Sequence, residues 1–499
     1  MGILAPLASA QTTIYVNGTT GNDAWDGLCE AWDGGTCGPK ATIQTGIDAA
    51  TNGDTVLVAD GTYTGSGNKN LDFGGKVITV RSENGPESCI IDCEDEGRGF
   101  YFHSGEPAEA GLDGFTIRNG HPAWNGPGSN HGAGIHCSNS SPTITYCVIT
   151  NNFASGSGGG IFCFASNPKI LNCMLRGNAS VDPTPYYAYY GGGMCNRGGS
   201  CPTVLNCTFS ENYTDGHGGG IYNEEGSNPV VLGCTFTENS AGYDGGGMYN
   251  YGNSCPTVTD CMFSGNSADD NGGGICNAYA SNPLVTCCTF CGNTASNWGG
   301  GGINCDIESS VTVVNCILWG NTREQIREGS AGVVVYSCIQ DDWRGEGNID
   351  DDPLFVDPGY WDDNGTPEDP EDDFWVNGDY HLQSDSPCID AGDPAFVPLP
   401  LEKDLDGMAR VWDGDDDDVR VVDMGAYEFG SRPFGDMNCD GFVNAYDIDG
   451  FILAASSYPD FGAYYERYPN CEPLLADANG DGIVNAYDID PFINLVAGG

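Results

Sequence analysis

Two stretches near the end of the chain have residue types and spacings that point to metal chemistry: DMNCDGFVNAYD at 436–447 and DANGDGIVNAYD at 477–488. Each places Asp, Asn, Asp, Gly, Asn and Asp at loop positions 1, 3, 5, 6, 9 and 12. Calcium is a hard cation that takes about six to eight oxygen ligands, and these side chains offer oxygen. The pattern therefore predicts about two calcium sites. The expected ligands are Asp436, Asn438, Asp440, Phe442, Asn444 and Asp447, then Asp477, Asn479, Asp481, Ile483, Asn485 and Asp488.

In this scheme Phe442 and Ile483 act through their carbonyl oxygens, and Asn444 and Asn485 act through water. Both loops are of the EF-hand type, with Asp instead of Glu at position 12. The pair, spanning 431–499, resembles a type I dockerin, a small helical calcium-binding module that docks onto cohesin domains. The resemblance implies a cohesin-like partner. Many dockerins carry Ser-Thr at loop positions 10 and 11, where both loops of this chain carry Ala-Tyr.

A second group of residues could supply acid–base chemistry. Arg118 lies close in sequence to His131 and His136, and Asp113 is on the same stretch. These four are the catalytic candidates, and turn positions are the alternative interpretation for the histidines. Paired carboxylates could serve glycoside hydrolysis instead. The candidates for that role are Asp215, Asp244 and Asp270, and Glu224 with Glu225.

Sugar contacts have one candidate segment, the stretch SVDPTPYYAYYGGG at 180–193. Flat aromatic side chains stack well on the apolar faces of sugar rings. An alternative is that this loop packs on its own part of the fold. The candidate contacts are Tyr186, Tyr187, Tyr189 and Tyr190.

The elements that position these groups come from a repeat. The motif Pro-x-aliphatic-x-x-Cys recurs at spacings of 26, 34, 27, 27 and 27 residues, from Pro142 to Pro283. Each unit holds short β-rich runs separated by Gly, Asn and Ser, and none holds a helical apolar period. A period near 27 residues predicts an all-β solenoid of stacked coils. The units resemble the right-handed parallel β-helices of pectate lyases and polymorphic surface proteins.

Stacking should align equivalent residues about 4.8 Å apart. It predicts a buried ladder of reduced cysteines and a structural ladder of asparagines. The glycine triplet of NGGGICN at 271–277 recurs too often for a phosphate site, and we interpret it as a corner of the scaffold. The ladders are Cys147, Cys173, Cys207, Cys234, Cys261, Cys288 and Cys316; Asn152, Asn178, Asn212, Asn239, Asn266, Asn293 and Asn321; and Cys137, Cys163, Asn196, Asn223, Asn250, Asn277 and Cys305.

The rest of the chain completes the expected organisation. Residues 1–10 end in a small-x-small pattern and read as the remnant of a secretory signal. The β-helix with its N-terminal cap spans 11–340, and 341–430 is an acidic closing segment with 28 acidic and 4 basic residues. An exported protein forms disulfides. The expected local pairs are Cys29–Cys37, Cys89–Cys93 and Cys439–Cys471.

Charge limits the function further. The net charge of −53 argues against binding nucleic acid or anionic membranes, and no apolar run is long enough to span a bilayer. Two functions remain open. The first is an extracellular polysaccharide lyase or glycoside hydrolase carrying a dockerin-like module. The second is a non-catalytic surface protein whose solenoid is a spacer or a glycan-binding face.

Overall fold

The structure is a computed structural model that describes residues 11–123, 130–181, 189–297, 299–306, 308–327, 329, 332–366, 373–398, 402–414, 419–468, 471–479 and 483–498. Among the predictions above, those for residues 1–10, Tyr186, Tyr187 and Asp481 lie outside the described residues.

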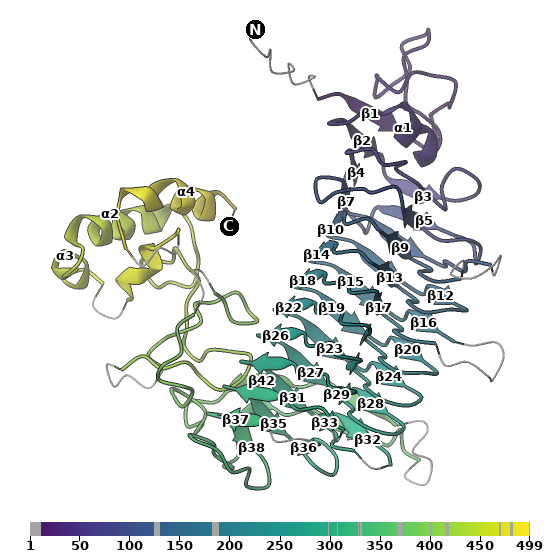
Figure 1. The fold of residues 1–499 in the computed structure, drawn as a ribbon. Helices are drawn as coiled ribbons and strands as arrows, with labels where there is room; N and C mark the ends of the chain where they lie inside the picture. Colours follow the sequence, from purple (N-terminus) through teal and green to yellow (C-terminus); the bar gives the residue numbers. More distant parts are fainter. Residues whose placement is uncertain are drawn as a thin grey trace, which may run out of the picture.

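The chain winds into a parallel β-helix that runs from β1 (Thr13–Val16) to about residue 340, and α1 (Ile43–Ala49) lies at its N-terminal end (Figure 1). Each central coil visits four stacked sheets in turn, which we call A, B, D and C. Sheet A contains β1 (Thr13–Val16), β2 (Thr55–Val58), β4 (Thr79–Ser82), β7 (Gly111–Asp113), β10 (Thr143–Thr145), β14 (Lys169–Leu171), β18 (Thr203–Leu205), β22 (Val230–Leu232), β26 (Thr257–Thr259), β30 (Leu284–Thr286), β34 (Thr312–Val314) and β37 (Val333–Val335). Sheet B contains β3 (Gly61–Tyr63), β5 (Cys89–Asp92), β8 (Thr116–Arg118), β11 (Val148–Thr150), β15 (Met174–Arg176), β19 (Thr208–Ser210), β23 (Thr235–Thr237), β27 (Met262–Ser264), β31 (Thr289–Cys291), β35 (Ile317–Trp319) and β38 (Cys338–Ile339).

The two other sheets complete each coil. Sheet D contains β12 (Phe153–Ala154), β16 (Ala179–Ser180), β20 (Tyr213–Thr214), β24 (Ser240–Ala241), β28 (Ser267–Ala268) and β32 (Thr294–Ala295). Sheet C contains β6 (Phe100–Phe102), β9 (Ile135–Ser138), β13 (Ile161–Phe164), β17 (Met194–Arg197), β21 (Ile221–Asn223), β25 (Met248–Tyr251), β29 (Ile275–Ala278), β33 (Ile303–Cys305) and β36 (Ile326–Arg327).

The sequence period sets the register of these sheets. Val204, Val231 and Val258 pair directly across β18, β22 and β26 in sheet A. Strand side chains alternate between faces, so these valines point inward and form one continuous core with the aliphatic rows of the other sheets. Helix α1 packs on the first coil, where a Cβ added at Gly46 would lie 2.5 Å from Val16. The helix thus covers an end of the core that would otherwise be open.

All three predicted ladders form. In the asparagine ladder, Asn239 donates from Nδ2 to Asn266 Oδ1 at 2.9 Å and to the carbonyl of Phe209 at 2.8 Å. In the cysteine ladder, the backbone N–H of Cys234 donates to the thiol of Cys261 at 3.4 Å, and the thiols are free and buried. Since each rung satisfies polar groups of the neighbouring coil, both ladders stabilise the stack.

The glycine triplet lies at the corner that leads into sheet C. Gly272 has φ +65°, and a Cβ there would lie 2.5 Å from the carbonyl oxygen of Ile275. A Cβ on Gly274 would lie 2.5 Å from the carbonyl oxygen of Gly302 in the next coil. Positive φ and close backbone approach both require glycine here, so the scaffold interpretation is confirmed.

The predicted disulfides are confirmed for two of the three pairs. Cys29 is bonded to Cys37, and Cys439 is bonded to Cys471. The predicted Cys89–Cys93 bridge is wrong, because both cysteines are free and buried along the extended segment of β5. Four residues of extended chain separate their Cα atoms by about 13 Å, well beyond the reach of a disulfide.

The closing segment packs along the outer face of sheet B. It contains two hairpins, and Trp361 on β40 (Tyr360–Asp362) donates its indole N–H to the carbonyl of Gly292 at 2.9 Å. The backbone N–H of Ala426 donates to Thr289 Oγ1 at 3.0 Å. These contacts fasten the segment to the last coils of the solenoid. The hairpins are β39 (Phe355–Asp357) with β42 (Asp379–Leu382), and β40 (Tyr360–Asp362) with β41 (Phe374–Val376).

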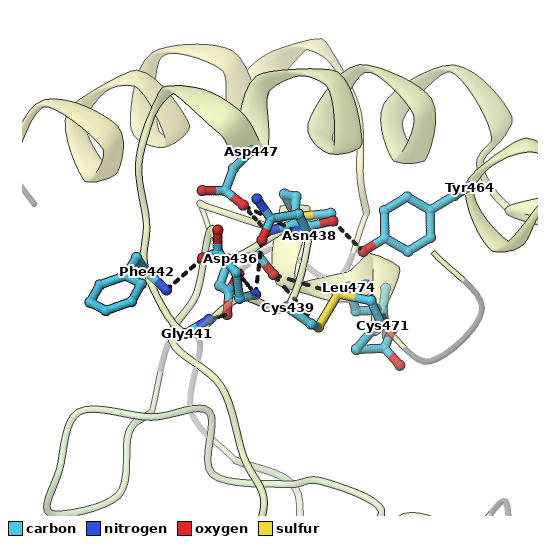
Figure 2. The surroundings of a disulfide bond; sticks show 12 residues. Asp436, Asn438, Cys439, Gly441, Phe442, Asp447, Tyr464, Cys471 and Leu474 are labelled. Atoms are coloured by element: carbon cyan, nitrogen blue, oxygen red, sulfur yellow. Dashed lines mark hydrogen bonds between the residues drawn. A yellow bond between two sulfur atoms is a disulfide. The ribbon is translucent and has the colours of Figure 1, made fainter. Parts of the chain in front are cut away.

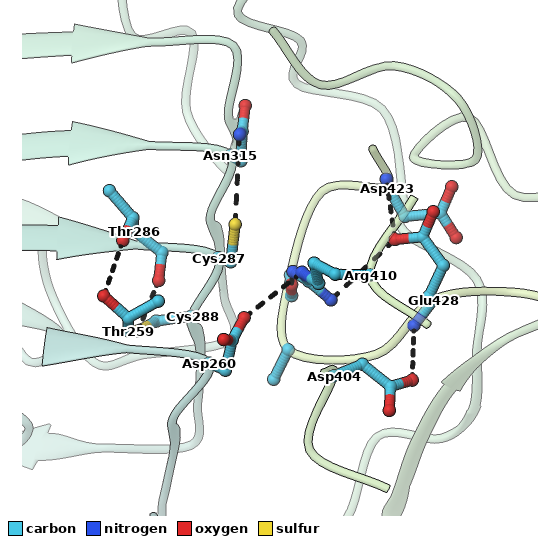
Figure 3. Close-up of polar contacts among 12 residues, drawn as sticks. Thr259, Asp260, Thr286, Cys287, Cys288, Asn315, Asp404, Arg410, Asp423 and Glu428 are labelled. Atoms are coloured by element: carbon cyan, nitrogen blue, oxygen red, sulfur yellow. Dashed lines mark hydrogen bonds and ion pairs between the residues drawn. The ribbon is translucent and has the colours of Figure 1, made fainter. Parts of the chain in front are cut away.

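A buried ion pair joins the solenoid to the closing segment (Figure 3). The fully buried guanidinium of Arg410 lies between Asp260 of the solenoid and Glu428 of the closing segment. Its Nε is 3.2 Å from Asp260 Oδ1, and its Nη1 is 3.9 Å from Glu428 Oε2. Desolvation outweighs the attraction of Arg410 and raises the pKa of Asp260 to about 7.

A small helical module follows the closing segment and lies to one side of the solenoid (Figure 1). Its own core contains Met437, Phe451, Tyr464, Leu475 and Phe492. Ala409 and Trp412 of the closing segment belong to the same packed cluster, so the module is packed against that segment. Its helices are η1 (Ala445–Asp447), α2 (Ile448–Ser457), α3 (Gly462–Tyr465), η2 (Pro473–Ala476), η3 (Ala486–Asp488) and α4 (Ile489–Gly498). No helix in the described part of the chain is long and apolar enough to cross a membrane.

Candidate functional site

The outer face of sheet C carries a row of aromatic and polar side chains. In each strand this row occupies the second position after the glycine corner, between two inward-facing residues. The paired rungs are Tyr101, His136, Phe162, Cys195, Tyr222 and Tyr249. Because parallel register stacks identical positions, rings from separate coils lie against one another. The rings of Tyr101 and His136 are 4.9 Å apart, and those of His136 and Phe162 are 5.0 Å apart.

Loop residues that precede the glycine corners fold back over this row. The ring of His131 stacks on Phe162 at 4.6 Å, and Tyr190 stacks on Tyr222 at 4.4 Å. These contacts bury much of the row, leaving Phe162 only 5% exposed. The row is interrupted at Cys195, whose small side chain separates the aromatic groups on either side.

A pocket of about 420 Å³ opens on this face, within the size range of sites that bind small molecules. Its walls mix aromatic rings with polar groups from four neighbouring strands and two loops. Phe164 is 43% exposed and offers an accessible ring face. The lining residues are Tyr101, His131, His136, Ser138, Phe162, Phe164, Arg197 and Glu225.

An ion pair between adjacent coils borders the pocket. Arg197 Nε is 2.7 Å from Glu224 Oε2, and both side chains are partly buried. Burial raises the pKa of Glu224 above its ordinary value, although the charge of Arg197 opposes this shift. Next to the pair, Glu225 Oε2 accepts the backbone N–H of Gly198 at 3.0 Å. The pocket edge thus carries one cation and two carboxylates.

The two predicted histidines both line the pocket, and both are neutral near pH 7. Burial lowers the pKa of His131 to about 4 and that of His136 to about 3. His131 Nδ1 accepts the backbone N–H of Ser157 at 2.7 Å, so its proton is on Nε2. These rings can exchange hydrogen bonds with a ligand but carry no charge for it.

The structure does not bring the other two catalytic candidates to these histidines. Asp113 is on β7 in sheet A, where it accepts a hydrogen bond from Thr145 Oγ1 at 2.9 Å. Arg118 is on β8 in sheet B and pairs with Asp92 at 3.0 Å. The residues are close in sequence, but each turn of a coil moves the chain to another sheet. The four candidates therefore do not form one acid–base cluster.

The carboxylates before the glycine corners do not form a ladder either. Asp244 pairs with His217 Nδ1 at 3.0 Å and accepts a hydrogen bond from Asn271 Nδ2 at 2.7 Å. Asp270 instead accepts from Asn297 Nδ2 at 2.7 Å. Asp215 lies in the rung of Gly242, two positions away from that of Asp244. The three turns are equal in length, but the carboxylates occupy the first, third and second positions after the sheet D strand, so they fall in different rungs.

Two of the four predicted sugar-contacting tyrosines are in the described part of the chain. Tyr190 joins the sheet C face by stacking on Tyr222, with its side chain half-buried. The carbonyl of Tyr189 accepts a hydrogen bond from Thr214 Oγ1 at 2.8 Å. Tyr190 thus lies on the same face as the pocket. The aromatic row itself was not predicted, although GGGIFC, GGGIYN and GGGMYN all place an aromatic residue at its position.

The first predicted calcium loop is closed by its own carboxylates (Figure 2). Asp447 Oδ1 accepts the backbone N–H of Met437 at 2.8 Å, and its Oδ2 accepts that of Asn444 at 2.8 Å. Asp436 Oδ2 accepts the backbone N–H of Gly441 at 2.9 Å. Burial raises the pKa of Asp436, and the nearby charges of Asp447 and Asp440 add to this effect. A cation in this loop would therefore offset the repulsion among Asp436, Asp440 and Asp447.

The remaining predicted ligands follow the same plan. Asn438 Oδ1 accepts the backbone N–H of Asp440, and the carbonyl of Phe442 accepts a hydrogen bond from Asn444 Nδ2 at 3.4 Å. In the second loop, Asp488 is fully buried and accepts the backbone N–H groups of Asn479 and Asn485 at 3.0 Å and 2.8 Å. Asn485 also donates to the carbonyl of Ile483, and Asp477 begins the loop.

The donor set suits calcium, since it consists of oxygen atoms at the expected spacing. Within the described ranges, however, no group of three or more His, Cys, Asp or Glu side chains is gathered closely enough to hold an ion. Instead, backbone N–H groups occupy the carboxylate oxygens of Asp436 and Asp447.

The two halves of the C-terminal helical module expose equivalent apolar side chains. Tyr446 is 79% exposed and Tyr487 is 81% exposed, one in each loop. Ile452 and Ile493 are each 55% exposed on α2 and α4. The duplicated loops thus present two similar apolar faces to solvent.

The central part of the chain matches a known family model. The family model of the right-handed β-helix region matches residues 108–290. The solved structures similar to this chain include pectate lyase Pel9A, at 14% identity over 84% of this chain and 97% of that one, with a TM-score of 0.49. A rhamnogalacturonan lyase is similar at 14% identity over 75% of this chain and 97% of that one, with a TM-score of 0.44. No curated protein matches the chain. The matched residues thus form a right-handed β-helix region, in agreement with the parallel strand pairing of sheets A to D, and a small helical region lies at the C-terminal end.

Proposed function

We propose that this is an exported, carbohydrate-directed β-helix protein that holds a glycan in the pocket on sheet C. The observation that carries the proposal is the composition of the pocket wall. Phe162, Phe164 and Tyr101 supply rings, while Arg197 and Glu225 supply polar groups beside them. Sugars combine apolar ring faces with rims of hydroxyl groups, and a wall of this kind complements both.

The proposal predicts that glycan affinity depends on the exposed ring of Phe164. Phe164→Ala should weaken binding about ten-fold, because an aromatic contact contributes about 0.5–1.5 kcal/mol beyond its buried area. Tyr213→Ala is a matched control, since Tyr213 is 44% exposed on sheet D and does not line the pocket. Calorimetry against pectins, alginates and neutral plant glycans provides the measurement. Equal effects of the two substitutions would rule out this pocket as the glycan site.

Catalysis at the same site is a second candidate, and the pair of Arg197 with Glu224 favours it. A half-buried carboxyl with a raised pKa can act as a general acid. The assay follows reducing ends and unsaturated products, and Glu224→Gln should abolish either signal. Bound glycan without any product would favour the alternative of a non-catalytic, adhesin-like surface protein. The activity classes tested are polysaccharide lyase and glycoside hydrolase.

We further propose that the C-terminal module binds about two calcium ions through the loop residues described above. Calcium would neutralise buried carboxylates such as Asp436 and so stabilise the module's fold. Calorimetry should show about two sites, which Asp436→Ala with Asp477→Ala removes. Asp449→Ala is the control, because Asp449 is an exposed residue on α2. An unchanged calcium titration in the double variant would contradict the assignment.

The two apolar faces of the module support a docking role, with a cohesin-like protein as the proposed partner. Exposed Tyr446 and Tyr487 would contact that partner through one face at a time. Two disulfides, Cys29–Cys37 and Cys439–Cys471, support export, because such bonds persist in oxidising compartments. Binding of immobilised cohesin domains, lost in Tyr446→Ala with Tyr487→Ala, tests the docking role.

A further inference from the structure

The charges at the pocket on sheet C carry information about the kind of glycan that fits there. Among the described residues that line it, Arg197 alone has a formal positive charge at neutral pH. That charge is matched by Glu224, at 2.7 Å from its Nε. Glu225 adds a carboxylate at the rim, so the group as a whole has a net negative charge.

One neighbouring cation, Arg98, acts on the pocket wall without lining the pocket. The two histidines of the wall are held neutral by burial, and His131 accepts a backbone N–H at the nitrogen that a proton would otherwise occupy. Arg98 lies over the ring of Tyr101, 4.7 Å from its centroid, and is 7% exposed. Its guanidinium faces that ring, and its charge adds to the effect of burial in lowering the pKa of His131 and His136.

The net charge of the whole chain also disfavours the binding of a polyanion. The chain has 70 acidic and 17 basic residues, so a polyanion approaching the protein meets a net negative charge. A uronate chain would bring one more carboxylate per residue to a pocket whose single lining cation is already paired. Neutral sugars meet no such penalty, and their hydroxyl groups can bond to the histidines, Ser138 and the ion pair.

We infer that the pocket on sheet C selects uncharged polysaccharides over polyuronates, and that the Arg197–Glu224 pair sets this selectivity. The inference rests on the proposed glycan-binding function and narrows it. A site of this kind also suits glycoside hydrolysis better than elimination, because elimination needs a uronate carboxyl next to the proton that is removed.

The pair supplies a gain-of-function test. Glu224→Gln removes one negative charge and leaves Arg197 without its carboxylate partner, so the guanidinium can receive a uronate. Glu225→Gln is a matched control with the same change of charge. It leaves the Arg197–Glu224 pair intact, and its amide oxygen can still accept the N–H of Gly198. Both substitutions alter side chains at the pocket rim, outside the buried core.

Calorimetry with the full chain would compare a neutral β-glucan, a neutral xylan and polygalacturonate, with calcium and with a chelator. The wild-type protein should bind a neutral glycan with little dependence on salt, and polygalacturonate at least ten-fold more weakly. Glu224→Gln should gain about ten-fold in polygalacturonate affinity, the size of one added hydrogen bond to a charged group, and Glu225→Gln should not.

The possible outcomes distinguish a failure of the inferred selectivity from a failure of the proposed glycan binding. Tighter binding of polygalacturonate than of neutral glycans by the wild-type protein, in either buffer, overturns the selectivity and leaves glycan binding in place. Equal gains in the two variants overturn the role of the ion pair, since overall charge would then explain them. Absence of binding to every glycan overturns the proposed function itself.

Discussion

The buried ion pair of Arg410 holds the closing segment against the solenoid, and the substitution Arg410→Met tests how much it contributes to stability. The side chain is fully buried between Asp260 and Glu428, and methionine fills similar space without a charge (Figure 3). Removing one partner of a buried ion pair typically costs about 3–5 kcal/mol, because the remaining charges stay desolvated. We expect a loss of this size at pH 8.

The loss of unfolding free energy caused by Arg410→Met should be smaller at acidic pH. Burial raises the pKa of Asp260 to about 7 and that of Asp423 to about 7, so both bind protons more readily in the folded state than in the unfolded chain. Their contribution to stability is therefore present below about pH 4 and is lost as the pH rises toward 7. Without Arg410 to oppose the shift, the loss with rising pH should be steeper.

The assay is urea unfolding followed by tryptophan fluorescence, because Trp361 and Trp375 lie in the interface with the solenoid. Arg176→Met is the control. Its pair with Glu211 is exposed on both sides, and such surface pairs contribute at most about 1 kcal/mol. A loss no larger than that of the control, or a loss that does not change between pH 5 and pH 8, would refute the reasoning.

Three further predictions concern the scaffold. Asn239→Ala should destabilise the solenoid by about 3–6 kcal/mol in urea unfolding, because it leaves several buried polar groups of adjacent coils unpaired, whereas exposed Asn297→Ala should change stability by less than about 1 kcal/mol. Gly272→Ala should lower the melting temperature and expose the sheet C corner to protease, because its φ is +65° and an added Cβ clashes; unchanged melting would contradict this. Replacing Cys439 and Cys471 by serine should destabilise the C-terminal module by about 3–4 kcal/mol, seen as earlier loss of its helical signal, since the bond closes a loop with a sequence separation of 32.

The repeat was enough to predict the coil and its ladders from the sequence alone. A period near 27 residues is enough to define the coil, since parallel strands pair equivalent positions of successive units. The ladders follow from the same rule, and Asn239 meets Asn266 as the spacing requires. The disulfides at Cys29–Cys37 and Cys439–Cys471 agreed with the expectation of local pairing. The calcium ligands were named from contiguous loops, where spacing along the chain is also spacing in space, and their role stays a prediction.

Only the tertiary structure shows which residues of a coil lie on the same sheet, because this depends on where the chain turns its corners. Asp113 and Arg118 are five residues apart but belong to different sheets, because the chain turns a corner between β7 and β8. Conversely, Arg197 and Glu224 are 27 residues apart and meet across β17 and β21 because one full coil separates them. The sequence period predicts that Arg197 and Glu224 lie side by side. It does not show whether their side chains point outward or which loops cover that face. The position of the pocket therefore depends on side-chain direction and loop path, which a one-dimensional repeat does not specify.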